Sequence, residues 1–303
     1  MRAALLREVD GPFELVELPD PVSDGKALVH VRAAGVNFAD VLIRRGRYPQ
    51  MPEFPVVLGS EVAGELDEGT RVMAMTSGHG GYAEIAAVDP AQVVELPARA
   101  SFAEGASFLL TFLTAYLPLT RQVRLREGAT VLVHAAAGGV GSAALQVARA
   151  LGARTVAAVG AREKLDLCRS LGAEEAYVYD EIPDAFRCDV VLDPVGGRLF
   201  EEGIARLRPL GTIVAIGFAG GLWPEVSPAA LVGRNVGVQG FYLGRLARHE
   251  PEVVTAALAE LLALWEDGSI APVVGAELPL DEVERAHALV ESRRSVGKVV
   301  LVP

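Results

Sequence analysis

A glycine-rich stretch in the middle of the chain carries the clearest chemical signal. An apolar segment, Thr130–His134, leads into small residues in which Gly139, Gly141 and Ala144 follow the spacing G-x-G-x-x-G/A. This spacing provides a tight turn, a close approach of the backbone to a pyrophosphate, and close packing of a helix on a strand. The segment 142–151 would then direct helix N–H groups at the phosphate. A ligand-free turn in a βαβ unit is the alternative. We predict dinucleotide binding by Ala137, Gly138, Gly139, Val140 and Gly141.

The residues at the tip of the next predicted strand indicate which dinucleotide the chain binds. NAD enzymes commonly present Asp or Glu to the adenosine ribose about 20 residues after the glycines. That place here reads Gly160, Ala161, Arg162, Glu163, Lys164. Two cations without a carboxylate at the strand tip suit a 2′-phosphate, which favours NADP(H). The alternative is a charged first turn of a surface helix, with Glu163 pairing locally.

Histidine and cysteine give little sign of a metal or a nucleophile. The five histidines (30, 79, 134, 249 and 287) show no H-x-x-x-H pairing, and His134 closes the glycine-turn strand. We interpret them as packed or solvated side chains. Cys168 and Cys188 are too few for a disulfide framework or a Cys₄ zinc lobe, and both fall in segments expected to be buried.

Composition limits the class of protein and its partners. The chain has 303 residues, of which 51% are apolar and 22% charged, so it can bury a large core and is expected to form two domains. A net charge of −11 argues against nucleic acid or an anionic membrane as the main partner. The start of the chain shows no secretory leader, and no uncharged apolar run reaches ~18 residues. We expect a cytoplasmic protein that acts on a small molecule.

The first hundred residues predict short strands separated by Pro and Gly, as in an antiparallel barrel or sandwich. Segment 37–45 is a predicted short helix, and 101–119 is an apolar helical stretch. The predicted strands are 2–6, 13–18, 27–36, 56–66, 70–75, 82–88 and 92–96.

After Gly128 the pattern changes to alternating strands and helices, which predicts a doubly wound parallel sheet. Amphipathic helices follow at 252–265 and 281–292, and the last strand, 297–302, is expected to return to the first domain's sheet. We therefore predict one domain from 1–112 with 247–303, and a dinucleotide-binding domain at 113–246. The predicted parallel strands are 130–134, 155–159, 176–179, 189–192, 212–216 and 236–240.

The chain resembles the medium-chain dehydrogenase/reductase superfamily, and most closely its zinc-free quinone oxidoreductase (zeta-crystallin-like) branch. The resemblance rests on residues 35–40 with 44–48, 134–141, 193–197 and 297–301. It implies an α/β protein with a GroES-like β-barrel catalytic domain, a Rossmann domain, and an active site where the two meet. Leu42 departs from the family, whose close members carry a pocket tyrosine there, and 61–72 is shortened.

The resemblance also implies the roles of individual residues. Zinc-containing members bind metal through a Gly-His-Glu motif and cysteines, whereas this chain has Gly59-Ser60-Glu61 and no cysteine before Cys168, so a metal-free site is expected. Asn37 and Tyr48 are the expected catalytic residues. Asn37 and Thr114 are expected near the nicotinamide, Tyr179 and Lys164 near the 2′-phosphate. The remaining cofactor-binding positions implied are Val195, Gly217, Phe218, Phe241, Tyr242, Leu243 and Arg293.

The predicted activity is NADPH-dependent reduction of quinones or similar conjugated carbonyls. Such acceptors need orientation more than a Lewis acid. Reduction of enoyl or alkenal C=C bonds is the alternative enzyme activity, and a non-catalytic NADP(H) sensor or structural protein is the alternative class. A homodimer is expected across the open sheet edge in 211–241, with 220–224 extending beside it. The pocket candidates supply mainly apolar surface: Asn37, Leu42, Tyr48, Phe218, Phe241 and Tyr242.

Overall fold

The computed structural model describes residues 1–223 and 225–303, and the chain divides into two units. Unit 1 comprises Met1–Leu110 and Pro272–Pro303, and unit 2 comprises Thr111–Ala271. The first boundary lies close to the one expected at 112/113. The second lies at 271/272 rather than at the expected 246/247, so the helices between these positions belong to unit 2.

Unit 2 is built on a six-stranded sheet with the order β11-β10-β9-β12-β13-β14, in which every neighbouring pair is parallel. This order is that of a doubly wound dinucleotide-binding sheet, and it confirms the predicted fold class. β9, at the centre, is fully buried because its neighbours and the covering helices enclose both faces. The strands are β9 (Thr130–His134), β10 (Arg154–Val159), β11 (Glu175–Val178), β12 (Cys188–Asp193), β13 (Leu207–Ala215) and β14 (Gly237–Gly240).

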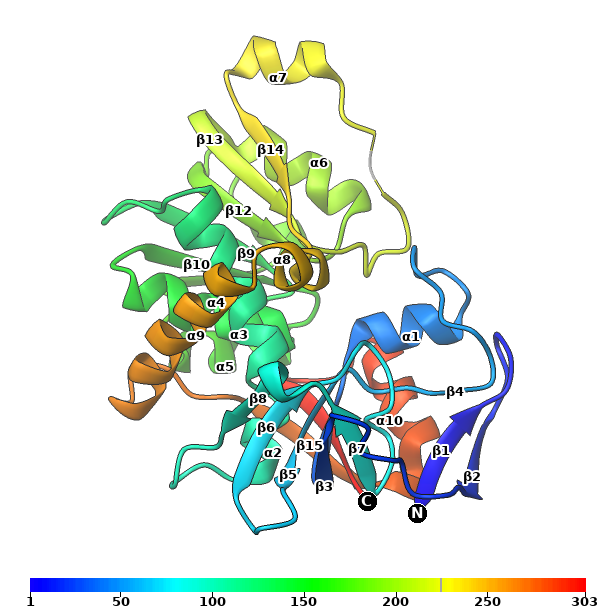
Figure 1. Cartoon of the computed structure of the whole chain (residues 1–303). Coiled ribbons are helices and arrows are strands. Elements are labelled where there is room, and N and C mark those ends of the chain that lie inside the picture. The colour runs from blue at the N-terminus through cyan, green and yellow to red at the C-terminus, as the bar shows by residue number, and fades with distance from the viewer. Residues whose placement is uncertain (224) are drawn as a thin grey trace. The chain divides into compact units, whose positions relative to one another are not determined.

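Helices cover both faces of this sheet. α4 and α5 follow β9 and β10 on one face, and α6 follows β12 on the other, as right-handed crossovers require (Figure 1). The helices of unit 2 are α3 (Leu109–Leu117, whose first two residues lie in unit 1), a π-helical turn (Pro118–Gln122), α4 (Gly139–Ala150), α5 (Leu165–Ser170), α6 (Gly197–Arg206), α7 (Pro228–Arg234), α8 (Leu243–His249) and α9 (Pro251–Glu266), with 3₁₀ turns at Arg162–Lys164 and Tyr179–Glu181.

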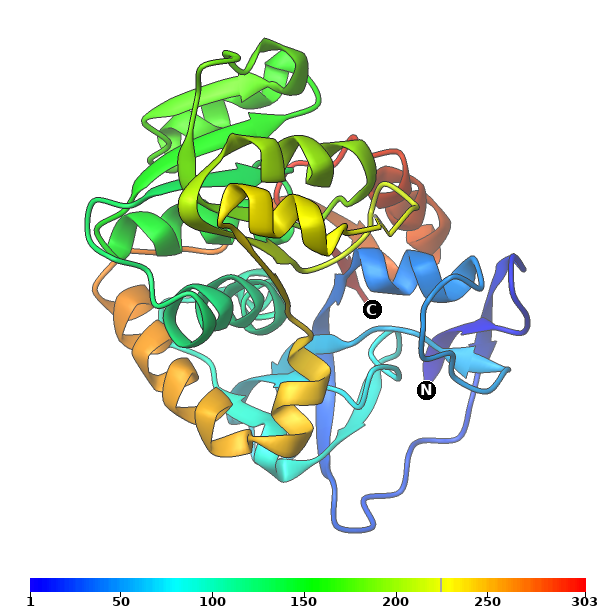
Figure 2. The same ribbon diagram turned by 90° about the horizontal axis from the view of Figure 1, so that it is seen from above.

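Side-chain hydrogen bonds explain why the last part of unit 2 stays with its sheet. The Gln146 amide donates to the carbonyl of Ala271 (2.9 Å) and accepts the N–H of the same residue (2.8 Å). The Tyr116 hydroxyl donates to Glu260, which fastens α9 to α3. Figure 2 shows α9 lying alongside α3 and α4. Contacts of this kind are made at long sequence distance, so the pattern of residues did not predict the boundary.

Unit 1 is mostly antiparallel, as predicted. One sheet has the order β2-β1-β4, and the other has the order β15-β16-β3-β5-β6-β8, with β7 also pairing with β3. The strands are β1 (Arg2–Leu6), β2 (Phe13–Glu17), β3 (Ala27–Val36), β4 (Val56–Val57), β5 (Glu61–Glu65), β6 (Arg71–Met75), β7 (Ile85–Val88), β8 (Val93–Glu95), β15 (Val274–Pro279) and β16 (Lys298–Val302). The helices are α1 (Phe38–Arg44), α2 (Phe102–Gly105) and α10 (Val283–Glu291), with 3₁₀ turns at Pro90–Gln92 and Leu280–Glu282.

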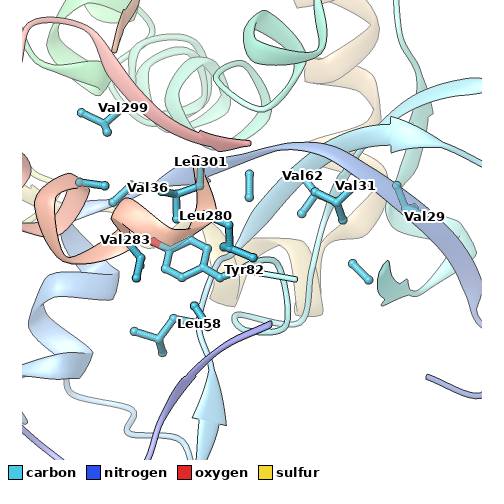
Figure 3. Close-up of a cluster of buried hydrophobic side chains, with 14 of the residues drawn as sticks. Val29, Val31, Val36, Leu58, Val62, Tyr82, Leu280, Val283, Val299 and Leu301 are labelled. Atoms are coloured by element: carbon cyan, nitrogen blue, oxygen red, sulfur yellow. The ribbon is translucent and has the colours of Figure 1, made fainter. Parts of the chain in front are cut away.

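The C-terminal segment returns to this sheet. β16 pairs antiparallel with β3, which confirms the prediction for the last strand. β15 was not predicted, and it pairs parallel with β16, because α10 crosses over between the two strands. These elements enclose an apolar core in which the ring of Tyr82 lies near Leu58, Leu280 and Val283 (Figure 3).

One helical run, Phe102–Gln122, is long and apolar enough by length and composition to cross a membrane. Within its most apolar window, 78% is buried inside the protein. A core helix of a soluble protein passes the same test, so the run is weak support for a membrane span.

Candidate functional site: the carboxyl edge of the parallel sheet and a buried charge cluster

The predicted cofactor-binding residues of unit 2 gather at one edge of the sheet. Because all six strands are parallel, their carboxyl ends lie along the same edge, where ligands of doubly wound sheets bind. Five segments follow five different strands: Ala137–Gly141 after β9, Gly160–Lys164 after β10, Val195 after β12, Gly217–Phe218 after β13 and Phe241–Leu243 after β14. Tyr179 follows β11. The structure therefore brings together residues that are up to about a hundred positions apart.

The turn after β9 is as tight as its sequence predicts. A Cβ atom on Gly141 would lie 2.2 Å from the carbonyl oxygen of Ala135, so only glycine fits. α4 begins at Gly139 and runs for 12 residues, and the first N–H groups of a helix have no partner within it. They provide the donors and the positive dipole end that a pyrophosphate requires.

Two contacts that the sequence did not reveal hold this turn. The Nδ1 atom of His134 lies 2.9 Å from a carboxylate oxygen of Asp193, and both side chains are at most 2% exposed. The same carboxylate accepts the N–H groups of Val195 (3.1 Å) and Gly196 (2.9 Å), so it joins the turns after β9 and β12. His134 is therefore more than the packed residue we predicted. The only sequence signal was its place at the strand end.

The hydroxyl of Tyr179 fixes the other side of the turn. It accepts the backbone N–H of Ala135 at 3.0 Å, and its ring makes an edge contact with His134. A Cβ on Gly160 would meet only this ring, at 3.6 Å, so the chain itself leaves room there. The predicted phosphate-binding tyrosine thus lies directly beside the glycine turn.

The two cations after β10 differ in environment. Arg162 is exposed and pairs with Glu181, which follows Tyr179 in sequence, rather than with Glu163 as the local-pairing alternative supposed. Lys164 is half-buried, and this burial lowers its pKa, while the charge of Glu163 opposes the change. Both cations lie at the strand tip, and a bound 2′-phosphate would replace the Glu181 carboxylate as the partner of Arg162.

The ends of β13 and β14 carry apolar surface. Phe218 is buried and packs against Trp223, with ring centroids 4.4 Å apart. Phe241 and Leu243 are also buried, whereas Tyr242 is 43% exposed. A small hollow of about 180 Å³ lies nearby and is lined by Gly196, Phe200, Ala215, Gly217, Trp223, Val226 and Val238.

Asn37 in unit 1 belongs to a buried charge cluster that the sequence did not predict. Lys298, at the start of β16, donates from Nζ to the Oδ1 atom of Asn37 (2.6 Å) and to Glu61. The Glu61 carboxylate also accepts the Asn37 amide (3.2 Å) and the N–H of Leu110 (3.1 Å). The Lys298 and Glu61 side chains are 4% and 1% exposed. The only sign of this cluster in the sequence was Lys298, one of three lysines in the chain, which stands in front of an apolar strand.

Asp40 lies beside this cluster and is fully buried. Its carboxylate accepts the backbone N–H of Asn37 (2.8 Å) and the hydroxyl of Tyr82 (2.9 Å). Burial raises the pKa of Asp40 to about 6, although these two hydrogen bonds and the charge of Lys298 act in the opposite direction. The cluster therefore places a carboxyl group with an unusual pKa next to Asn37.

The structure places four other predicted residues within their own units. In unit 1, Tyr48 is half-buried against the apolar core, Leu42 is buried in α1, and Arg293 is exposed after α10. In unit 2, Thr114 is half-buried in α3.

The cysteines have the environment predicted for core residues. Cys168 and Cys188 are fully buried, and this burial raises the pKa of their thiols to about 11 and about 12. Thiols of this kind stay protonated at neutral pH and are poor nucleophiles or ligands. Within residues 1–223 and 225–303, no three His, Cys, Asp or Glu side chains are grouped to hold a metal ion.

A doubly wound parallel sheet, of the kind that binds dinucleotides at its carboxyl edge, together with an antiparallel unit built from both ends of the chain, is the architecture expected of a two-domain dinucleotide-dependent enzyme. Profiles of two known families match the chain: "Alcohol dehydrogenase GroES-like domain" at residues 23–98 and "Zinc-binding dehydrogenase" at residues 139–262.

Relatives of known name extend over almost the whole chain. The quinone oxidoreductase-like protein 2 of Bos taurus is 33% identical over 99% of this chain and 92% of its own length. The synaptic vesicle membrane protein VAT-1 homolog of Rattus norvegicus is 34% identical over 94% of this chain and 79% of its own. The quinone oxidoreductase of Thermus thermophilus, which was also solved in complex with NADPH, is 41% identical, with a TM-score of 0.94 and full coverage of both chains. The chain belongs to the quinone oxidoreductase branch of the medium-chain dehydrogenase/reductase superfamily, and it is an oxidoreductase.

Proposed function

We propose that this protein binds NADP(H) at the carboxyl edge of the unit 2 sheet. The observation that carries the proposal is the group formed by Gly160, Arg162, Lys164 and Tyr179, in which two cations follow a glycine whose Cβ position would meet only the ring of Tyr179. The glycine turn before α4 fits the pyrophosphate, because its N–H groups and helix dipole favour an anion. The complex of the Thermus thermophilus quinone oxidoreductase with NADPH supports the same cofactor.

The proposed reaction is the reduction of quinones by hydride transfer. NADPH, when bound, supplies the hydride. The chain's own residues bind and orient the reactants: by family resemblance, Asn37 and Tyr48 contact the reacting end. A quinone accepts a hydride without a Lewis acid, since its reduced oxygen is delocalised, so placement is the main requirement. The names of the relatives support this substrate class.

A metal-free site is part of the proposal. Ser60 stands where zinc-containing members of the superfamily have a histidine ligand, and the ammonium of Lys298 already neutralises Glu61. A divalent cation beside Glu61 would be repelled by this ammonium in a region of low dielectric constant. Asn37, Glu61 and Lys298 therefore satisfy one another within this cluster.

Cofactor choice can be tested by charge reversal at the strand tip. We expect NADPH to bind well over tenfold tighter than NADH, each tenfold being ~1.4 kcal/mol. Lys164→Glu should shrink that gap, whereas Lys26→Glu, at an exposed lysine of unit 1, should leave it unchanged. Dissociation constants for both cofactors, measured by fluorescence titration, decide the matter. Equal constants for the two cofactors in the wild type would refute the assignment.

Substrate class can be tested with a panel of acceptors. We expect turnover of simple benzo- or naphthoquinones with NADPH and little turnover of ethanol or acetone, because saturated carbonyls need charge stabilisation on a developing alkoxide. Tyr48→Ala or Asn37→Ala should reduce turnover more than Cys168→Ala. Faster reduction of enones or enals than of any quinone would favour a C=C reductase. NADPH binding without any turnover would favour a sensor.

We also propose a homodimer formed across the edge strand β14. This strand pairs with β13 on one side and is the last in the sheet order. Large apolar side chains on the adjoining elements are exposed: Leu210 (85%), Leu222 (71%), Trp223 (54%) and Val232 (77%). An open edge and exposed apolar residues both require cover. Pro224, in the segment expected to extend beside this edge, lies outside the described residues.

A further inference from the structure

The side-chain amide of Asn37 is held between two buried groups of opposite charge. The ammonium of Lys298 can only donate hydrogen bonds, and the carboxylate of Glu61 can only accept them. Lys298 Nζ lies 2.6 Å from Asn37 Oδ1, and Asn37 Nδ2 lies 3.2 Å from Glu61 Oε1. These partners fix which end of the amide points in which direction. A flipped amide would place two donors against each other and an oxygen against a carboxylate.

The rest of the unit keeps this arrangement in place. The second oxygen of Glu61 accepts the backbone N–H of Leu110. A Cβ on Gly35 would lie 2.9 Å from the Glu61 carboxylate and 2.2 Å from the carbonyl of Ala106, so glycine allows Glu61 to approach. The backbone N–H of Asn37 is fixed by Asp40. Both the main chain and the side chain of Asn37 are therefore held by charged groups.

We propose that Lys298 is a positioning residue: together with Glu61 it fixes the Asn37 amide in one orientation, and in this way it sets how Asn37 binds NADP(H). In this orientation one amide N–H is bound to Glu61, and the other makes only a 3.5 Å contact with the Gly35 carbonyl. Among the described residues, one donor and one lone pair of Oδ1 are thus left for a further partner. The inference rests on the proposed function, in which Asn37 contacts the cofactor.

The choice of variants follows from the charges. Lys298→Met alone would leave the Glu61 carboxylate buried without a counter-charge, and such variants are strongly destabilised. Lys298→Met with Glu61→Gln removes both charges and keeps an oxygen for Leu110, and replacement of a whole buried pair is commonly tolerated. Lys298→Arg keeps the charge and the donors, and serves as the conservative variant.

The orientation itself can be observed in the wild type without any variant. Asn37 and Asn235 are the only asparagines in the chain, so selective ¹⁵N-asparagine labelling yields two side-chain NH₂ groups. Asn235 is exposed at the end of α7 and is the internal control. We expect the NH₂ protons of Asn37, assigned by their loss in Asn37→Ala, to exchange slowly with solvent and to be well separated in shift. Fast exchange equal to that of Asn235 would overturn the proposal even if every Lys298 variant failed to fold.

The effect on the cofactor is measured by titrating NADPH into four proteins: wild type, Asn37→Ala, Lys298→Met/Glu61→Gln, and the triple variant. We expect the double variant to bind NADPH about tenfold more weakly, which is ~1.4 kcal/mol. If Lys298 acts through Asn37, the same change should have almost no effect when Asn37 is already alanine. The single variant Lys298→Arg, which keeps Glu61, should bind NADPH almost as tightly as the wild type.

The outcomes separate this inference from the function on which it rests. If Asn37→Ala leaves the NADPH dissociation constant unchanged, the assignment of Asn37 to the cofactor is wrong, and the inference fails with it. If Asn37→Ala weakens binding but the folded double variant binds like the wild type, only the role of Lys298 is refuted. An equal loss in both Asn37 backgrounds would show that Lys298 acts through the general structure, which also overturns the proposal.

Discussion

Substitution of His287 should remove a specific acid sensitivity from unit 1. His287 lies in α10, is 1% exposed, and both of its ring nitrogens lack a hydrogen-bond partner within the part of the chain that the structure describes. Its ring packs edge-on against Phe13, at 4.7 Å between centroids, and against Tyr82, at 5.8 Å. This burial lowers the pKa of His287 to about 3. The charges of Arg44 and Arg45 lower it too, and that of Glu291 opposes them.

The lowered pKa determines the sign and the size of the effect. Between about pH 6.5 and pH 3 the unfolded chain binds a proton on this histidine that the folded chain does not, so the free energy of unfolding falls as the pH falls. The folded and unfolded pKa values differ by about 3.5, which corresponds to about 5 kcal/mol once the pH is below 3. Between pH 7 and pH 5 the loss should be about 2 kcal/mol.

His287→Leu keeps an apolar side chain in the same space and cannot bind a proton. Urea unfolding followed by circular dichroism at pH 7 and pH 5 should show that the variant gains about 2 kcal/mol relative to the wild type at the lower pH. Both tryptophans, Trp223 and Trp265, lie in unit 2, so tryptophan fluorescence follows that unit separately. His79→Leu, at an exposed histidine of unit 1, is the control. If the wild type and His287→Leu lose stability in parallel, the reasoning is refuted.

Three further predictions follow from the charge cluster and the sheet edge. Burial raises the pKa of Asp40 from 3.8 to about 6, so this group makes folding less favourable as the pH rises from 4 to 7. In the same urea experiment, the free energy of unfolding of Asp40→Asn should gain about 2 to 3 kcal/mol over that of the wild type across this range. A difference that does not change with pH would contradict the buried-carboxyl account. Purified protein should contain no stoichiometric zinc by elemental analysis and keep its activity in chelator, whereas about one tightly held zinc per chain, with activity lost on its removal, would disprove the metal-free site. Sedimentation at micromolar concentration should show a dimer that Val232→Glu weakens, and a stable wild-type monomer would count against pairing across β14.

The sequence predicted the strands of unit 2 and the glycine turn at their carboxyl edge because these signals are local. Each predicted residue immediately follows a strand, and in a parallel sheet the ends of strands meet at one edge whatever the details of packing. Gly141 also has a local reason, since its neighbour in space is Ala135, six positions earlier. The G-x-G-x-x-G/A spacing therefore located the glycine turn, and the distance of about 20 residues from it located the cations at Arg162 and Lys164.

The buried polar partners could not be predicted in the same way, because they come from distant parts of the chain. Lys298 meets Asn37 and Glu61 across 261 and 237 positions, and His134 meets Asp193 across 59. A charged residue beside an apolar strand is commonly a surface residue, and only the fold shows that this one is enclosed. The second domain boundary differed from the expected position for the same reason, since the Gln146 and Ala271 that hold this segment to unit 2 are 125 positions apart.

The buried carboxylates of the two units have different partners, and this difference bears on function. In unit 2 the carboxylate of Asp193 is satisfied by one imidazole and two backbone N–H groups, so the turn that we propose to bind the cofactor is held rigidly. In unit 1 the ammonium of Lys298 pairs with the buried carboxylate of Glu61, whereas the buried carboxylate of Asp40 feels only the charge of Lys298. Burial therefore acts most strongly on Asp40, the carboxyl group without a direct cation partner, and raises its pKa to about 6. Protonation of Asp40 below this pH would leave Lys298 and Glu61 as a balanced pair around Asn37, so the hold on the Asn37 amide should persist in mild acid while the neighbouring charge changes.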